Sequence, residues 1–122
     1  MQEHTVARLV DIGEPGALEF TVGDGDWPFR GFIVRWQGDV YAYANTCPHA
    51  GHPLNLDPTG FFTPDQAQLI CSSHGALFDP STGACTGGPC AGAALHRLDC
   101  RVSADEILVK APVSQRGFVP DQ

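Results

Sequence analysis

Two short segments of the chain combine a cysteine with a histidine at a spacing suited to metal binding. The first has the pattern Cys47-x-His49, and the second has the pattern Cys71-x-x-His74. Thiolate sulfur and imidazole nitrogen are donors that zinc, copper and iron bind in proteins. Each segment therefore offers one thiolate and one imidazole, and together they could supply all four ligands of a metal site.

The spacing within each segment distinguishes two kinds of site. A single tetrahedral zinc ion could use all four residues. Structural zinc sites, however, usually pair like ligands across two to four residues, and a Cys-x-His pair is a cramped chelate for one ion. With two metal ions, each segment could place its cysteine on one ion and its histidine on the other. The spacing favours the binuclear site, while the zinc site stays open as an alternative.

The sequence around both segments resembles the Rieske [2Fe–2S] proteins, in which two histidines replace two cysteines on one iron. The resemblance covers most of the chain and is carried by residues 47–52 (CPHAGH), residues 71–79 (CSSHGALFD), Gly83 and residues 87–89 (GGP). It implies one [2Fe–2S] cluster per chain, with Cys47 and Cys71 on one iron and His49 and His74 on the other. Residues 50–70, an interval of 21 positions, are longer than in many relatives. We expect the extra length in a loop at 57–62 beside the cluster.

The resemblance also bears on the reduction potential. Two ferric ions, two sulfides and two thiolates sum to zero charge, so the cluster accepts an electron more readily than an all-cysteine cluster. Respiratory Rieske proteins add a disulfide between the cluster loops and hydroxyl donors to the sulfur atoms. The corresponding positions here are His52, Ser73, Ala76 and Phe78. Because those donors are missing, we expect a value in the lower part of the Rieske range of about −150 to +300 mV.

Alternating apolar residues outside the two segments predict β-strands, and no window of helical length shows a 3.6-residue period. Leu18, Phe20 and Val22 share one face, and a turn at 37–39 joins two alternating runs into a hairpin. The expected strands span 17–22, 32–36, 40–44, 67–71, 97–102 and 106–110. We therefore expect an all-β fold of short antiparallel strands. The resemblance implies that they form a Rieske-like antiparallel β-sandwich with a small cluster-binding subdomain made of loops.

The middle of the chain differs from its ends. Between Arg35 and Arg97 there is no lysine or arginine, and most of the glycine and proline lies there, in loop-like segments at 45–60, 71–83 and 85–92. Loops held by a rigid scaffold often carry chemistry. We expect one domain over 1–122, with the cluster-binding part at approximately 45–92 and the remainder as the β scaffold.

Composition limits the partners and the compartment. The 122 residues carry a net charge of −7, which argues against nucleic acid or an anionic membrane as a partner. Five cysteines are too few for a secreted disulfide scaffold. The first residues have no basic or apolar export signal, and no uncharged stretch is continuous enough to span a bilayer. We expect a soluble, cytoplasmic protein.

Other residues in the loops could be taken for functional groups. His52 follows His49 by three positions, and we expect it to be a histidine at the cluster rim without a ligand role. Cys85 and Cys90 could form a redox pair or a second metal site, but free cysteines more often pack as small hydrophobic residues, which we expect for both. Cys100 alternates inward on a predicted strand and is also expected to pack.

These features predict a one-electron carrier. The ferredoxin-type resemblance implies that it accepts an electron from a flavoprotein reductase and passes it to a terminal oxygenase. No second group of two histidines and one carboxylate is present to bind mononuclear iron. We therefore expect no catalytic residue, and we expect that the chain is not an enzyme by itself. Two alternatives are a small Rieske-like subunit of a multisubunit reductase, such as nitrite reductase, and a zinc-stabilised binding module.

Overall fold

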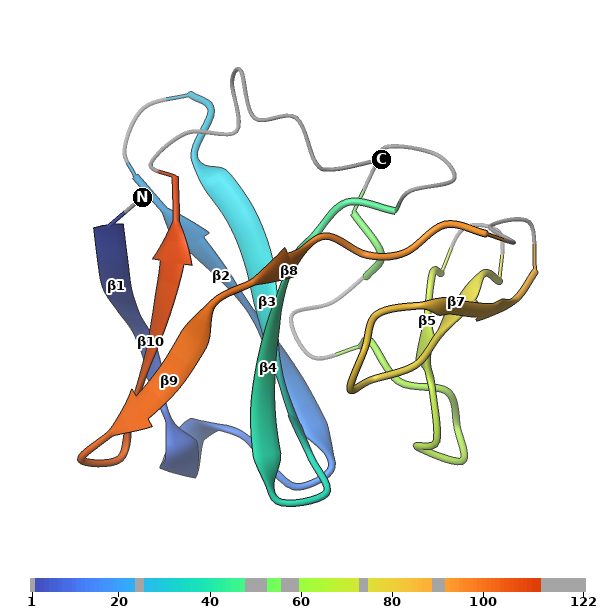
Figure 1. Cartoon of the computed structure of the whole chain (residues 1–122), viewed down its shortest axis with the longest axis horizontal. Coiled ribbons are helices and arrows are strands. Elements are labelled where there is room, and N and C mark those ends of the chain that lie inside the picture. Colours follow the sequence, from blue (N-terminus) through green and yellow to red (C-terminus); the bar gives the residue numbers. More distant parts are fainter. Residues whose placement is uncertain are drawn as a thin grey trace.

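The computed structural model describes residues 2–23, 26–47, 53–55, 60–72, 75–88 and 92–112, and the strands among them form three antiparallel sheets that lie as layers (Figure 1). The outer sheet has the order β1-β10-β9, from Gln2–Arg8, Glu106–Ala111 and Cys100–Ser103. The central sheet has the order β2-β3-β4-β8, from Gly16–Val22, Phe29–Trp36, Asp39–Ala44 and Arg97–Leu98. The small sheet has the order β5-β6-β7, from Leu69–Ile70, Leu77–Phe78 and Cys85–Gly87.

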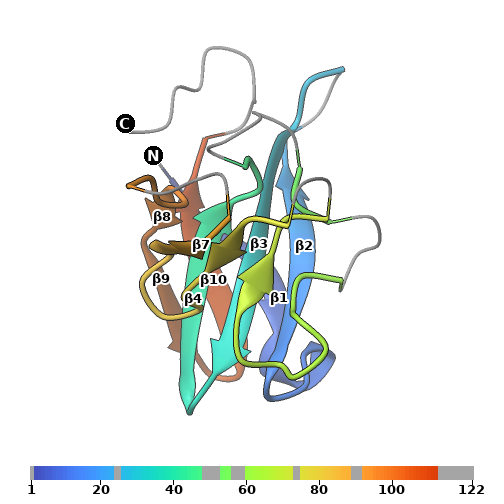
Figure 2. The same cartoon turned by 90° about the vertical axis from the view of Figure 1, so that its right-hand side faces the viewer.

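Strand β3 of the central sheet is covered on both faces. Its apolar residues point alternately to the outer sheet and to the small sheet. Phe29 and Ile33 face the outer sheet, and Phe32 and Val34 face the small sheet. Figure 2 shows the small sheet in front of the central sheet. A strand covered on both sides is expected to read as a nearly continuous apolar run, as this one does.

Two hydrophobic cores follow from this arrangement. The first core lies between the outer and central sheets and includes Phe20 and Val22, which confirms the face predicted for them. The second core lies between the central and small sheets, and its buried members are Ala17, Phe32, Val34, Tyr43, Cys47, Leu54, Phe61, Leu69, Cys71, Ala76, Phe78 and Leu95. The all-β fold expected from the alternation and the antiparallel β-sandwich implied by the resemblance are confirmed.

The predicted hairpin at 32–44 is also confirmed. Strands β3 and β4 pair antiparallel, with Trp36 opposite Asp39. The two residues between them, Gln37 and Gly38, have φ values of 52° and 86°. Positive φ at both positions is what a two-residue type I′ turn requires, and glycine adopts it without steric cost.

Several element boundaries differ from the prediction. The strand expected at 67–71 contains only β5, and strands β6 and β7 lie in segments expected to be loops. The single strand expected at 97–102 is divided at Asp99, because β8 joins the central sheet and β9 joins the outer sheet. Val102, on β9, is 43% exposed. Strand β1, which shows no clear alternation, and the short 3-10 helix η1 (Leu9–Asp11) were not predicted.

Among the described residues, no helix is both long and apolar enough to cross a membrane.

Tyr43 links the central sheet to the small sheet. Its side chain is fully buried, and its hydroxyl donates a hydrogen bond of 2.8 Å to the carbonyl oxygen of Pro80, in the turn that follows β6. The ring packs 5.6 Å from Phe32, centroid to centroid. Burial raises the pKa of this phenol, so the group stays protonated and remains a donor throughout the physiological range.

Replacing Tyr43 by phenylalanine should lower the free energy of unfolding by about 1 to 2 kcal/mol, because the buried Pro80 carbonyl would lose its donor. Urea denaturation measures this change. The matched control is Tyr41→Phe on the same strand, whose half-buried side chain should change stability by less than about 0.5 kcal/mol. Equal effects of the two variants would show that the bond to Pro80 contributes nothing of its own.

Candidate metal centre

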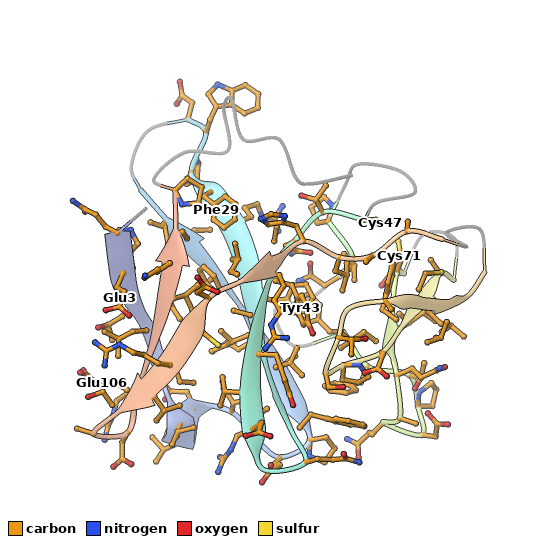
Figure 3. The ribbon with its side chains drawn as sticks, viewed as in Figure 1. Glu3, Phe29, Tyr43, Cys47, Cys71 and Glu106 are labelled. Atoms are coloured by element: carbon orange, nitrogen blue, oxygen red, sulfur yellow. The ribbon has the colours of Figure 1, made fainter. Side chains whose placement is uncertain are left out.

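The two cysteines predicted as ligands follow strands of different sheets. Cys47 comes shortly after the end of β4, and Cys71 comes directly after β5. Neither is in a disulfide and neither has exposed surface, and both belong to the core between the central and small sheets. Figure 3 shows them on the same side of the molecule, beside the small sheet. The fold therefore gathers two sulfur donors from segments 24 residues apart.

The two histidines predicted as ligands, His49 and His74, lie outside the described residues, as does His52. In the part of the chain that the structure describes, no group of three or more histidine, cysteine or acidic side chains could hold a metal ion. Of the four predicted ligands, the structure describes the two cysteines, and it places both in the same core.

Backbone hydrogen bonds shape the segment that carries Cys71. Its amide donates to the carbonyl oxygen of Ala76 at 2.9 Å, and its carbonyl oxygen accepts from Gly75 at 2.9 Å. Gly75 has a φ of 74°, which closes this turn in a conformation that glycine adopts freely. The next amide along the chain, of Ser72, donates to Leu54 at 2.8 Å. This last bond joins the second cysteine segment to the first.

A third segment packs on the second. Strand β7 pairs with β6, and the amide of Cys85 donates to Ala93 at 3.0 Å, which closes the segment at its base. At Gly88 a Cβ atom would lie 2.9 Å from the Cα atom of Ala76, and φ is 84°. Because only glycine fits so close an approach, the backbone of the third segment lies directly against the turn after Cys71.

Cys85 is disulfide-bonded, so the expectation that it packs as a free thiol is wrong. Cys90, the other residue of that expectation, lies outside the described residues. The described cysteines that are not in a disulfide are Cys47, Cys71 and Cys100. Cys100 packs against the core between the outer and central sheets and donates from its sulfur to the carbonyl oxygen of Val40 at 3.4 Å. Burial raises the pKa of the Cys100 thiol, as expected for a packing residue.

Asp79 organises the turn between β6 and β7. Its carboxylate accepts hydrogen bonds of 2.7 Å from the hydroxyl and from the backbone amide of Ser81, and a third of 3.3 Å from the amide of Thr82. The Ser81 hydroxyl is the main reason that the pKa of Asp79 lies below its usual value. This turn presents the Pro80 carbonyl to Tyr43 and so holds the small sheet against the central sheet.

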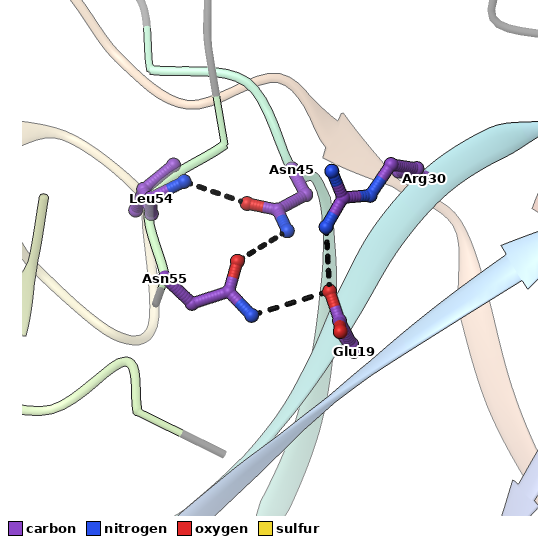
Figure 4. A network of polar contacts seen from close by, with 5 residues as sticks. All are labelled: Glu19, Arg30, Asn45, Leu54 and Asn55. Atoms are coloured by element: carbon purple, nitrogen blue, oxygen red, sulfur yellow. Dashed lines mark hydrogen bonds and ion pairs between the residues drawn. The ribbon is translucent and has the colours of Figure 1, made fainter. Parts of the chain in front are cut away.

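Polar residues around the first cysteine segment were missed in the sequence. Asn45 is 3% exposed and is bonded to Leu54 and to Asn55, which in turn is bonded to Glu19 (Figure 4). An asparagine in a loop ordinarily suggests a turn, so nothing marks its burial. The one available signal is its position, two residues before Cys47.

The described donors fit an iron–sulfur cluster. Iron in [2Fe–2S] clusters is bound by cysteine thiolates, alone or together with histidine. Cys47 and Cys71 are two buried sulfur donors from adjoining segments, within a stretch of the sequence, 36–96, that contains no lysine or arginine.

Comparisons with known proteins agree with this chemistry. The family model for the Rieske [2Fe-2S] domain matches residues 3–109. A search of the curated proteins found none that matches. Among solved structures, the ferredoxin of carbazole 1,9a-dioxygenase from Nocardioides aromaticivorans IC177 is 29% identical, with a TM-score of 0.67, over 89% of this chain and 97% of that one.

Two further structures share the fold at lower identity. The Sphingomonas yanoikuyae B1 ferredoxin is 16% identical, with a TM-score of 0.69, over 91% of this chain and 100% of that one. The terminal oxygenase of carbazole 1,9a-dioxygenase from Novosphingobium sp. KA1 is 19% identical, with a TM-score of 0.69, over 99% of this chain but only 30% of its own. The chain therefore belongs to the Rieske [2Fe-2S] domain family and is an electron-transfer protein that holds one [2Fe–2S] cluster, not a zinc module.

Proposed function

We propose that the chain is the ferredoxin component of an oxygenase system, which accepts one electron from a flavoprotein reductase and passes it to a terminal oxygenase. The observation that carries this proposal is the match to the carbazole 1,9a-dioxygenase ferredoxin, at 29% identity over 97% of that protein. Another solved structure is a complex of reduced oxygenase and oxidised ferredoxin from carbazole 1,9a-dioxygenase, and it matches 93% of this chain. A partner of the same kind, a terminal oxygenase, suits this chain.

The proposed ligands are Cys47 and Cys71 on one iron and His49 and His74 on the other, within a cluster-binding part at approximately 45–92. The full burial of both cysteines supports a thiolate-bound iron on the inner side. The histidine-bound iron would then be the outer one, and its imidazoles would form the path by which the electron leaves. When bound, the cluster supplies one-electron exchange, and the chain supplies the donors and a nearly uncharged surrounding surface.

Histidine ligation makes the reduction potential depend on pH. An imidazole bound to the oxidised cluster loses its proton more easily than one bound to the reduced cluster, so reduction favours the protonated form. The potential should therefore be constant near neutral pH and fall on the alkaline side. Electron paramagnetic resonance of the dithionite-reduced protein should also give a lower average g value than all-cysteine ligation gives.

Replacing His49 by cysteine tests the ligand assignment. The variant should either shift the spectrum toward that of an all-thiolate cluster or lose the cluster. A spectrum and a pH profile identical to those of the unmodified protein would remove His49 from the ligand set.

The electron-transfer role is tested separately, by reducing the protein with a flavoprotein reductase and measuring its oxidation by a terminal oxygenase at several salt concentrations. Because the net charge is −7, association with a basic partner should weaken as salt is added.

A further inference from the structure

We infer that Asn45 is a positioning residue for the cluster, and that the carboxylate of Glu19 sets its orientation through Asn55. The inference rests on the ligand role proposed for Cys47, which lies two residues after Asn45. Among the described residues, Asn45 is the one buried polar or charged residue, at 3% exposure. A buried amide is stable only when its donors and acceptors are paired, so its partners identify its task.

Asn45 closes the segment that carries Cys47. Its side-chain oxygen accepts a hydrogen bond of 2.9 Å from the amide of Leu54, nine residues further along the chain. Its backbone amide donates to the carbonyl oxygen of Arg30 at 3.0 Å, which fixes this end of the segment on strand β3. Asn45 therefore ties the backbone of Leu54 to the end of strand β4 and to strand β3.

Leu54 extends the effect to the second cysteine. Its side chain is fully buried, and its carbonyl oxygen accepts a hydrogen bond of 2.8 Å from the amide of Ser72, next to Cys71. The Leu54 peptide is thus held on one side by the Asn45 amide and on the other side by the second cysteine segment. A change at Asn45 would alter the relative position of the two segments that carry Cys47 and Cys71.

The direction of the hydrogen bonds shows what orients Asn45 (Figure 4). The Asn45 amino group donates to the Asn55 side-chain oxygen at 2.8 Å, and the Asn55 amino group donates to a carboxylate oxygen of Glu19 at 3.2 Å. An ionised carboxylate can only accept. Asn55 must therefore turn its amino group to Glu19 and its oxygen to Asn45, which leaves the Asn45 oxygen facing Leu54.

Arg30 fixes the far end of this chain of bonds. Its guanidinium lies 3.0 Å from the same Glu19 oxygen, with side chains that are 42% and 26% exposed. This ion pair is too exposed to contribute much stability. Its role in the chain of bonds is to hold the Glu19 carboxylate directed at Asn55. The Glu19 carboxylate thereby determines the orientation of the side-chain amide of Asn45.

The variant Asn45→Asp should disrupt this series of hydrogen bonds. The new carboxylate can still accept from Leu54, but it has no amino group for Asn55. Asn55 must then turn its own amino group inward, and its oxygen faces the Glu19 carboxylate without a proton between them. We expect a fall in melting temperature of about 3 to 6 °C, about tenfold faster loss of iron to a chelator, and a shifted reduction potential.

Adding Glu19→Gln should restore these properties. The new amide can donate to the reversed Asn55 oxygen, so every group in the double variant has a partner again. The variant Glu19→Gln alone should behave nearly as the unmodified protein, since its amide oxygen can accept from Asn55 as the carboxylate does. This pattern, one harmful change, one neutral change and a recovered pair, is a coupling that separate packing effects do not produce.

The experiment measures melting temperature, iron retention and reduction potential for the four proteins, together with Val109→Ala. Val109 is fully buried in the other core, so this control lowers the melting temperature without touching the cysteine segments. We expect the Asn45→Asp potential to shift beyond that of the control and to return in the double variant. A double variant no better than Asn45→Asp, or an Asn45→Asp potential equal to that of the control, would overturn the inference. None of the three measurements needs a reductase or an oxygenase, so failure here is separate from failure of the proposed function.

Discussion

Serine in place of Cys47 or of Cys71 will leave the protein without its [2Fe–2S] cluster. Both thiols are fully buried in the core between the central and small sheets. A serine hydroxyl is a much poorer iron ligand than a thiolate, because its proton is held far more tightly. Iron and acid-labile sulfide should therefore fall from one cluster per chain to nearly none, and the visible absorption of the cluster should disappear.

Cys100→Ser is the matched control for these two variants. Cys100 is also a free cysteine and partly buried, but it belongs to the other core, where its sulfur donates to the Val40 carbonyl. A serine hydroxyl can keep that bond, so this variant should retain a full cluster. Full iron and sulfide content in either Cys47→Ser or Cys71→Ser would remove that residue from the ligand set. Equal losses in all three variants would show a general sensitivity of the fold to serine.

Replacing Phe61 by alanine should lower the free energy of unfolding by about 3 to 5 kcal/mol. The Phe61 ring is fully buried and stacks on Phe32 of strand β3, with centroids 4.3 Å apart and planes at 17°. Its carbonyl oxygen also accepts a hydrogen bond of 2.8 Å from Ile70. The ring therefore fills the space between the central and small sheets, and alanine would leave a cavity there. Since a domain is stable by only about 5 to 15 kcal/mol, this loss is a large fraction of the total.

Phe62→Ala provides the comparison for Phe61. The neighbouring ring is only partly buried and packs at the edge of the same core, so its loss should cost less than half as much. If Phe61→Ala does not fold, Phe61→Leu keeps the site apolar and should give an intermediate loss, measured by urea denaturation. Equal destabilisation by Phe61→Ala and Phe62→Ala would contradict the role given to the stacked ring.

The fold could be predicted from the sequence where the alternation of side chains is local. The hairpin at 32–44 has alternating runs on both sides of a two-residue turn, and both features lie within a few residues of one another. Strand β1 shows no such pattern, and what holds it is pairing with β10, about a hundred residues further along the chain. The division of the strand predicted at 97–102 likewise depends on which sheet each half joins, and a periodic pattern does not contain that choice.

The same distinction holds for the site. Each cysteine is within three positions of its histidine in the sequence, and this local spacing predicts the family that the comparison shows. The bonds that hold those loops connect distant positions: Asn55 reaches Glu19 across 36 residues, and Tyr43 reaches Pro80 across 37. The disulfide of Cys85 could not be predicted either, since two cysteines five positions apart in the sequence are equally compatible with free thiols.

Strand β3 contributes alternate residues to both cores, and this limits how the gene can change in length. Insertion or deletion of one codon within Phe29–Trp36 would exchange the two faces of the strand, so that Phe32 and Ile33 would each face the wrong neighbour. Both cores would be disrupted together, including the core in which Cys47 and Cys71 are packed. Natural variation in length should therefore occur in the connections between strands, where an added residue changes a surface loop and leaves the packing of both cores unchanged.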